Sequence, residues 1–308
     1  LLYWGSKGID GFRCDMAEMV PVEFWEWVIP EVKSRYTSMI FIGEAYNAEV
    51  YGTYLNKGRF DYLYDKVGLY DGLKKLIKNE TNADVKEISR VWQIETAGFG
   101  NRMLSFLENH DEERIASAGF AVDPLYALPA MVVSAPLSAG PVMLYFGQEV
   151  GEPAKGIEGF GGDDNRTSIF DYWGISEHQK WMDNGAFDGG KLDHKQITLR
   201  NYYKKLMGIV AVSDAVQNGQ IYEIPVTGNM NNRMYGYIRY TANQRLLIIV
   251  NFDRTKILTG KISLPNEVLK IKASVPVTEL LSGKKLNIPS GASIPVKVSP
   301  ASAQIIEF

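Results

Sequence analysis

Three acidic residues follow short apolar segments of this chain, and their type and placement could serve one reaction. Asp15 and Glu44 each end an apolar run, and Asp111 comes four residues after Leu107. Two carboxylates about 5–5.5 Å apart can cleave a glycosidic bond with retention: one attacks the anomeric carbon, and the other protonates the leaving oxygen and then activates water. A third can stabilise positive charge in the transition state. An acid after a strand is more often a helix cap, but three at successive strand ends favour a shared site.

The elements that must position these acids are parallel strands alternating with helices, because the carboxyl ends of such strands converge on one face of a barrel. The predicted strands are Ile9–Asp15, Met39–Gly43, Phe60–Tyr64, Met103–Leu107 and Val142–Phe146. Helical spacing of apolar residues predicts helices over Val22–Arg35, Tyr70–Asn79, Asp84–Thr96, Leu125–Leu137 and His194–Val212. The alternation predicts an α/β layer structure.

After Ser213 the pattern changes to short strands separated by turn residues, which is typical of an all-β sandwich. The strands predicted there are Gln220–Val226, Arg233–Thr241, Gln244–Phe252, Gly260–Leu264, Pro276–Leu281 and Ser302–Phe308. We therefore assign residues 1–213 to a partial catalytic barrel and residues 214–308 to a C-terminal antiparallel β-sandwich. A long Gly- and Asp-rich loop over residues 147–174 separates the last barrel strand from the helix that precedes the sandwich.

Four segments of the chain resemble the α-amylase family of glycoside hydrolases. Three match signature regions of that family: Gly11-Phe12-Arg13-Cys14-Asp15, Ile42-Gly43-Glu44-Ala45 and Phe106-Leu107-Glu108-Asn109-His110-Asp111. The fourth, from Gly140 to Glu149, is similar to the family's last barrel strand, and Asn165-Arg166-Thr167-Ser168 with Trp173 is similar to the loop after it. The resemblance implies the last five strands of a TIM (β/α)8 barrel, followed by a β domain.

The resemblance also implies the roles of the site residues. Asp15 would be the nucleophile, Glu44 the general acid/base and Asp111 the transition-state stabiliser. Arg13 lies two residues before Asp15, on the same strand face, and its charge would keep the nucleophile ionised. His110 would hydrogen-bond sugar hydroxyls. No cofactor is implied for the chemistry, and no metal ligand is assigned in this chain.

Two departures from the family pattern affect substrate and metal binding. The family often has Lys-His three and four residues after the nucleophile, where this chain has Glu18 and Met19, so the acceptor-side subsite differs. The family's first signature region, on the third barrel strand, is missing. In the family that region also ligates a structural calcium, which we therefore expect only in the full-length protein.

A barrel of this class needs eight strands, and this chain has candidates for five. We expect a C-terminal fragment of a longer enzyme, whose partner is the missing N-terminal half of the barrel. We also expect the fragment to be inactive alone, because part of the glucose subsite is absent. Because the sequence begins at Leu1 and not at a methionine, it does not show whether a leader segment precedes it, and we predict no compartment.

The leading function is a retaining hydrolase that cleaves α-glucosidic bonds in starch-like glucans or malto-oligosaccharides. A transglycosylase on the same scaffold is the first alternative, because the two share the covalent intermediate and differ in the acceptor. A non-catalytic carbohydrate-binding relative is the second, although such relatives usually lose one of the three acids.

Composition excludes several other classes. The 308-residue chain has a net charge of −3, so no basic field predicts nucleic-acid binding and no polybasic run predicts a membrane surface. The longest apolar stretch is broken by Pro129, Pro136 and Pro141 and does not predict a membrane span. With Cys14 as its one cysteine, the chain cannot form an internal disulfide.

Overall fold

The structure is a computed structural model that describes residues 1–155, 163–170, 175–228, 232–265, 268, 274–291 and 293–308. It forms two compact units, which are described separately. The first comprises Leu1–Gly72, Lys86–Phe106 and Ala139–Val142, and the second comprises Leu73–Val85, Leu107–Ser138 and Met143–Phe308. Within the described residues, no helix is both long and apolar enough to cross a membrane.

A five-stranded sheet organises the first unit. Its strands are β1 (Gly11–Cys14), β2 (Ile40–Gly43), β3 (Tyr62–Tyr64), β4 (Met103–Phe106) and β5 (Val142–Met143). They lie in the order β1-β2-β3-β4-β5, and the pairs from β1 to β4 are parallel. All five predicted barrel strands are therefore present, and the prediction of a partial TIM barrel followed by a β domain is confirmed.

The first unit also contains the helices α1 (Leu2–Gly5), α2 (Val22–Lys33), α3 (Tyr51–Asn56) and α5 (Lys86–Arg90). Of these, α2 and α3 pack apolar side chains against this sheet. On α2, the residues Trp25, Val28, Ile29 and Val32 are buried, as their spacing of three and four predicts. They join Phe41 of β2 in one hydrophobic core.

Two predicted helices differ from the observed ones because π-helical turns interrupt them. The segment predicted as Tyr70–Asn79 is α4 (Asp71–Ile77), which is preceded by a π-helix over Lys66–Tyr70. The segment predicted as Asp84–Thr96 divides into α5 and a π-helix over Val91–Glu95. The period of 3.6 residues does not distinguish a π turn from an α turn over so short a stretch.

The second unit begins its helical part with α6 (Leu128–Ser134) and continues with α7 (Ser176–Met182), α8 (His194–Val212) and α9 (Asp214–Gln217). The bounds predicted for α8 agree with the structure. A capping box fixes its first turn: the Asp193 side chain accepts from Gln196 N at 2.9 Å, and the Gln196 side chain accepts from Asp193 N at 3.1 Å. Short 3-10 helices lie at Ala17–Met19, Ala48–Val50, Gly100–Arg102, Pro124–Ala127, Gln148–Val150 and Asp183–Gly185.

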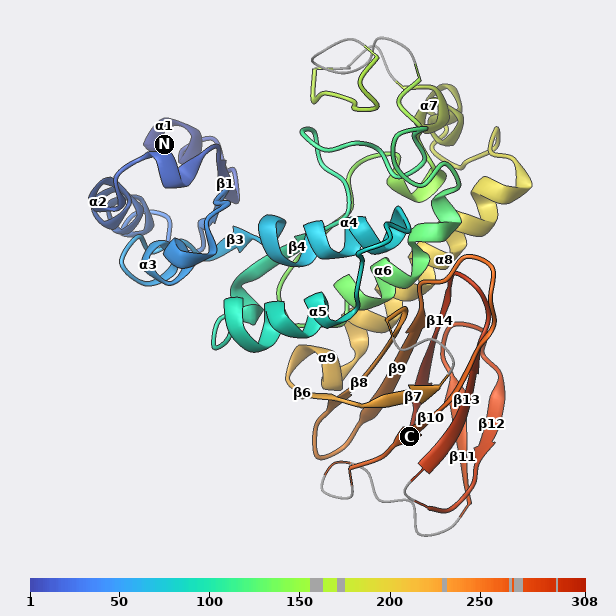
Figure 1. The fold of residues 1–308 in the computed structure, drawn as a ribbon. Coiled ribbons are helices and arrows are strands. Elements are labelled where there is room, and N and C mark those ends of the chain that lie inside the picture. The colour runs from blue at the N-terminus through green and yellow to red at the C-terminus, as the bar shows by residue number, and fades with distance from the viewer. Residues whose placement is uncertain (156–162, 171–174, 229–231, 266–267, 269–273, 292) are drawn as a thin grey trace. The chain divides into compact units, whose positions relative to one another are not determined.

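Two antiparallel sheets form the C-terminal sandwich, which belongs to the second unit (Figure 1). The smaller has the order β13-β10-β7 and the larger the order β12-β11-β14-β9-β8-β6. The strands are β6 (Gln220–Glu223), β7 (Val226–Gly228), β8 (Met234–Tyr240), β9 (Arg245–Asn251), β10 (Leu258–Ser263), β11 (Val275–Glu279), β12 (Lys285–Ile288), β13 (Ser293–Val298) and β14 (Ser302–Glu307). Their inward side chains form a continuous core.

The sequence predictions missed β12 and β13, and they merged β6 and β7 into one strand, although the two lie in different sheets. β13 contains Pro295, which is normally confined to edge strands, and β13 lies at the edge of the smaller sheet. Its residues nevertheless alternate between exposed and buried, as a half-buried strand requires. The domain assignment of residues 1–213 and 214–308 stays a prediction.

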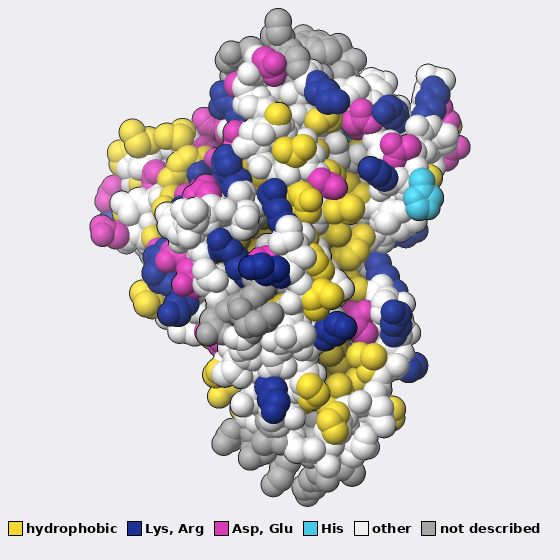
Figure 2. Space-filling view, turned by 45° about the vertical axis from the view of Figure 1, so that its right-hand side comes forward, with side chains coloured by type: hydrophobic (Ala, Val, Ile, Leu, Met, Phe, Trp, Pro, Cys, Tyr) yellow, Lys and Arg dark blue, Asp and Glu magenta, His cyan; other side chains and the backbone are white. Residues whose placement is uncertain are grey.

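On the face drawn in Figure 2, Lys and Arg side chains lie interspersed with Asp and Glu. This mixture agrees with the small net charge of −3. The Trp173 proposed from the resemblance, and much of the loop over residues 147–174, lie outside the described residues.

Candidate active site

Two of the three predicted acids emerge side by side from adjacent strands of the first unit. Cys14, the last residue of β1, pairs with Gly43, the last residue of β2. The next residues are Asp15 and Glu44, so both carboxylates leave the sheet at the same end. Because the strands are parallel, that end is the one at which α/β barrels carry their reacting groups.

Arg13 contacts both carboxylates. Its Nη1 donates to Asp15 Oδ1, and its Nη2 lies 2.7 Å from Glu44 Oε1. The contact with Asp15 agrees with the period of two along a strand, which places these residues on one face. One guanidinium therefore holds the two carboxylates in a fixed relation.

The environment keeps Arg13 charged. Burial alone would lower the pKa of Arg13, but hydrogen bonds to the Tyr64 hydroxyl and to Asp15 raise it above its ordinary value. Arg13 Nε donates to Tyr64 Oη at 3.2 Å, and the guanidinium carbon lies 5.3 Å from the centre of the Tyr64 ring. Tyr64 is the last residue of β3 and supports Arg13 from two strands away, across β2.

The two carboxylates have different exposure to solvent. The Asp15 side chain is 74% exposed and the Glu44 side chain 3%. Glu44 Oε2 accepts from Met16 N at 2.8 Å, and Glu44 Oε1 accepts from the Tyr46 hydroxyl at 2.7 Å. Hydrogen bonds to both oxygens therefore fix the orientation of the Glu44 carboxyl group, whereas the Asp15 carboxylate is open to an incoming ligand.

Tyr46 and Tyr64 were not identified from the sequence. Tyr46 lies two residues after Glu44, as Arg13 lies two residues before Asp15, so the same spacing argument could have found it. Lys66 Nζ lies 5.7 Å from the centre of the Tyr46 ring and forms an ion pair with Asp71 at 2.9 Å. A cation near the ring face holds Tyr46 in place.

The third predicted acid, Asp111, belongs to the second unit and is paired there with His110. Their closest atoms, Asp111 Oδ2 and His110 Nε2, are 3.1 Å apart. Asn109 Oδ1 accepts from the backbone N–H of Asp111 and of Glu112, both at 2.9 Å, and Arg166 Nη1 donates to the Asp111 carbonyl at 3.4 Å. These bonds fix the turn that presents Asp111.

A buried ion pair anchors this turn. Glu108 Oε2 accepts from Arg114 Nη1 at 2.8 Å, and Glu108 Oε1 accepts from Ile115 N at 2.6 Å. Arg114 Nε donates to Thr167 Oγ1 at 2.7 Å, and the guanidinium lies 4.2 Å from the centre of the Tyr145 ring. Burial raises the pKa of Glu108, and the charge of Arg114 opposes that shift.

The structure thus brings Arg13, Asp15 and Glu44 together in one unit and His110 and Asp111 together in the other.

The positions that depart from the family pattern are both placed in the first unit. Glu18 Oε2 accepts from Asn47 N at 3.0 Å, so this side chain ties the segment after β1 to the segment after β2. Met19 is 73% exposed.

Burial raises the pKa of the Cys14 thiol to about 11, and the nearby Arg13 opposes this only in part, so the thiol is protonated at neutral pH.

A structural calcium is not placed by the acidic and histidine side chains that the structure describes. In the described part of the chain, no group of three or more His, Cys, Asp or Glu side chains is placed to hold a metal ion.

Parallel strands that end in paired acids, followed by an antiparallel sandwich, define the fold class as part of an α/β barrel with a β domain after it. The model of the alpha amylase catalytic domain matches residues 1–186, which is more than half of the chain. The chain belongs to the alpha-amylase family.

Its curated relatives are distant and longer. Alpha-amylase 3 of Dictyoglomus thermophilum is 24% identical over 276 residues, which cover 82% of this chain and 52% of the relative. An alpha-1,4-glucan:maltose-1-phosphate maltosyltransferase of Picrophilus torridus is 23% identical over 266 residues, covering 86% of this chain and 36% of the relative. The chain therefore spans about half, or less, of the length of these relatives.

Solved structures share the fold. The alpha-amylase of Geobacillus thermoleovorans complexed with acarbose superposes with a TM-score of 0.74 at 19% identity, covering 99% of this chain and 61% of that one. A maltogenic alpha-amylase of Thermotoga neapolitana gives a TM-score of 0.71 at 18% identity, covering 99% and 63%.

Proposed function

We propose that this chain carries the catalytic acids of a retaining enzyme that cleaves α-glucosidic bonds in starch-like glucans or malto-oligosaccharides. The observation that carries the proposal is the contact of one arginine, Arg13, with both Asp15 and Glu44 at the carboxyl ends of adjacent parallel strands. Relatives include an alpha-amylase, and solved neighbours include an AmyP in complex with maltose.

The proposed reaction has two steps. In the first, the exposed carboxylate of Asp15 attacks the anomeric carbon while Glu44 gives a proton to the leaving oxygen. In the second, Glu44 takes a proton from water, and the oxygen of that water replaces Asp15 at the same carbon. Asp111, with His110 beside it, would stabilise the positive charge that develops on the sugar.

Arg13 and Tyr46 would prepare the two acids for these steps. Arg13 supplies a fixed positive charge to Asp15 and so favours its ionised, nucleophilic form. Tyr46 holds the Glu44 oxygen at 2.7 Å, which limits rotation of the carboxyl group while protons are transferred.

We also propose that activity needs the N-terminal half of the barrel. The described sheet has five strands, and a closed barrel of this class has eight. We expect a structural calcium to draw on ligands supplied by that other half, because the described residues hold no group of three or more His, Cys, Asp or Glu side chains placed to bind a metal ion.

A transglycosylase is the second candidate, and it is supported by the residues at the acceptor-side subsite. Glu18 and Met19 stand where the family often has Lys-His, and the relatives include maltosyltransferases. In a transglycosylase a sugar hydroxyl would replace water in the second step. A non-catalytic carbohydrate-binding protein is the third candidate, and it is disfavoured because all three acids are present.

The test uses the longest form of the protein that contains these 308 residues, incubated with maltotriose. Asp15→Asn and Glu44→Gln should each reduce turnover on the order of 10²–10⁴-fold, whereas Asp10→Asn, at an exposed position, should leave it unchanged.

The products separate the candidates. Proton NMR should show that the α-anomer is released first, and a first-formed β-anomer would refute retention. Products longer than maltotriose would identify a transglycosylase. Robust turnover by the isolated 308-residue chain would refute the requirement for the other half-barrel.

A further inference from the structure

The second unit contains a pocket of about 870 Å³ that the proposed chemistry does not use. Its lining comes from the loop over residues 116–125, from residues 150–155, from Asp163 and Asn165, from Glu177 of α7 and from the start of α8. Asp111 is not among the lining residues. The volume falls within the roughly 300–1,000 Å³ that is usual for small-molecule sites.

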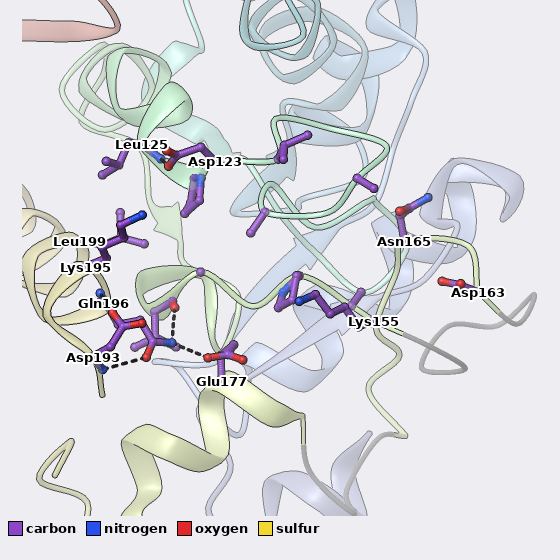
Figure 3. A pocket seen from close by; sticks show the side chains of 18 residues that line it. Asp123, Leu125, Lys155, Asp163, Asn165, Glu177, Asp193, Lys195, Gln196 and Leu199 are labelled. Atoms are coloured by element: carbon purple, nitrogen blue, oxygen red, sulfur yellow. Dashed lines mark hydrogen bonds between the residues drawn. The ribbon is translucent and has the colours of Figure 1, made fainter. Parts of the chain in front are cut away.

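One wall of the pocket is preformed by hydrogen bonds around Gln196 (Figure 3). Its Nε2 donates to Glu177 Oε2 at 2.6 Å and to the Val150 carbonyl at 3.1 Å, while its backbone N–H is held by Asp193. Since Gln196 is 8% exposed, this network is locked in place before any ligand arrives. Preformed polar walls reduce the entropy lost on binding.

Further polar groups of the lining are Asp123, in the loop over residues 116–125, and Asn165. Asp123 Oδ1 accepts from Leu125 N at 3.0 Å, and Asn165 Oδ1 accepts from Gly119 N at 3.3 Å. These bonds fix the two side chains at the pocket edge, where Figure 3 shows both of them.

Three charged groups of the lining are available to a ligand. Within the part of the chain that the structure describes, Lys155, Asp163 and Lys195 make no ion pair. They therefore provide two donors and one acceptor whose hydrogen-bonding capacity is not consumed by a salt bridge.

The balance of charge decides which ligand class fits. The lining holds four carboxylates and two ammonium groups: Asp123, Asp163, Glu177, Asp193, Lys155 and Lys195. Glu177 is paired at 2.5 Å with Lys180, which is not part of the lining, and the other three carboxylates still outnumber the two ammonium groups, so an anion would be repelled. A divalent cation is not favoured, since the described residues contain no cluster of three potential ligands. A wholly apolar ligand would leave charged groups without water or partners.

A neutral polyhydroxyl ligand matches this mixture of charged and polar groups. Its hydroxyls can donate to carboxylates and accept from ammonium and amide N–H groups. The C–H faces of a sugar ring can pack on Pro124, Leu125 and Leu199, which also line the pocket. We propose that this pocket is a second carbohydrate site, which binds an α-glucan of roughly two or three sugar rings. The choice of an α-glucan over other sugars rests on the proposed function.

The experiment is a calorimetric titration of the chain with maltotriose and with cellotriose. Ala118 is exposed and lines the pocket, so Ala118→Trp should fill it without disturbing the core. Ala242, exposed in the turn between β8 and β9, provides a matched control in Ala242→Trp. We expect maltotriose binding in about the millimolar range, weakened at least about tenfold by Ala118→Trp and unchanged by Ala242→Trp.

Several results would overturn the proposal. Absence of maltotriose binding, or full affinity in a folded Ala118→Trp variant, would show that the pocket is not the site. Equal affinity for cellotriose would overturn the α-glucan selectivity. Loss of binding in Glu44→Gln would place the sugar at the catalytic acids instead, which refutes the second site and leaves the proposed function standing.

Discussion

Arg114→Met is the substitution whose effect on stability follows most directly from the contacts. Arg114 is 0% exposed and Glu108 2% exposed, and their closest atoms are 2.8 Å apart. Removing the arginine leaves a buried carboxylate without its counter-charge, which costs about 3–5 kcal/mol of unfolding free energy. The hydrogen bond to Thr167 is lost as well, so the upper part of that range applies.

The loss should depend on pH, and its sign follows from Glu108. Burial raises the pKa of Glu108 in the folded state above its unfolded value. Such a group stabilises the fold fully below the unfolded pKa, and this contribution is lost as pH rises through the folded pKa. Without Arg114 the pKa of Glu108 in the folded state rises further. Each additional unit of that pKa lowers the free energy of unfolding at high pH by about 1.4 kcal/mol. The variant should therefore lose more stability at about pH 7.5 than at about pH 5.

Urea unfolding followed by tryptophan fluorescence at both pH values measures these differences. Glu108→Gln added to Arg114→Met should recover much of the loss, because the buried charge is then gone. Arg35→Met is the control: Arg35 lies 3.7 Å from Glu31 in an exposed pair, which is worth about 0.5 kcal/mol or less. A loss below about 1 kcal/mol at both pH values, or a larger loss at the lower pH, would refute the reasoning.

Three further predictions concern the first unit. Tyr46→Phe should lower kcat on maltotriose about tenfold, and should affect α-maltosyl fluoride less, because fluoride leaves without a proton from Glu44. Burial raises the pKa of Asp65 to about 6, so the parent protein should lose about 3 kcal/mol of unfolding free energy as the pH rises from about 4 to about 7. Asp65→Asn should remove this loss. Gly11→Ala should cost about 1–3 kcal/mol, since its Cβ would lie 2.4 Å from the Ile40 carbonyl oxygen.

Each of these predictions has its own check. For Tyr46→Phe, an equal loss on both substrates would indicate a merely structural role. For Asp65→Asn, urea unfolding across the pH range should give a flatter profile than the parent, and an unchanged profile would contradict the assignment. For Gly11→Ala, the control is Gly52→Ala in α3, whose new Cβ meets its nearest atom at 4.0 Å and should be tolerated.

Local patterns in the sequence were sufficient to predict the five barrel strands and the long helix α8. The five barrel strands are apolar runs bounded by polar residues, and α8 has both a capping box and helical spacing. β13 was missed because Pro295 suggests a break, although at a sheet edge a proline is tolerated. The π turns were missed because their apolar spacing resembles that of an α-helix.

Within the site, the two-residue period of a strand predicts contacts between side chains of one strand, but it does not predict contacts between different strands. Two-residue spacing placed Arg13 beside Asp15, and the structure adds that the same guanidinium contacts Glu44. The support from Tyr64 could not be predicted, because it depends on the register between strands 51 residues apart in sequence. The anchoring of the Asp111 turn by Glu108 and Arg114 likewise needs the folded chain.

Trapping of the covalent intermediate tests most directly whether Asp15 is the nucleophile of a retaining glycosidase. A fluorinated α-glucosyl fluoride forms the glycosyl-enzyme faster than water removes it, and peptide mapping by mass spectrometry then locates the adduct. In the longest form of the protein, the label should map to Asp15 and disappear in Asp15→Asn. An adduct on Glu44 or Asp111, or turnover to the inverted anomer, would contradict the proposed roles.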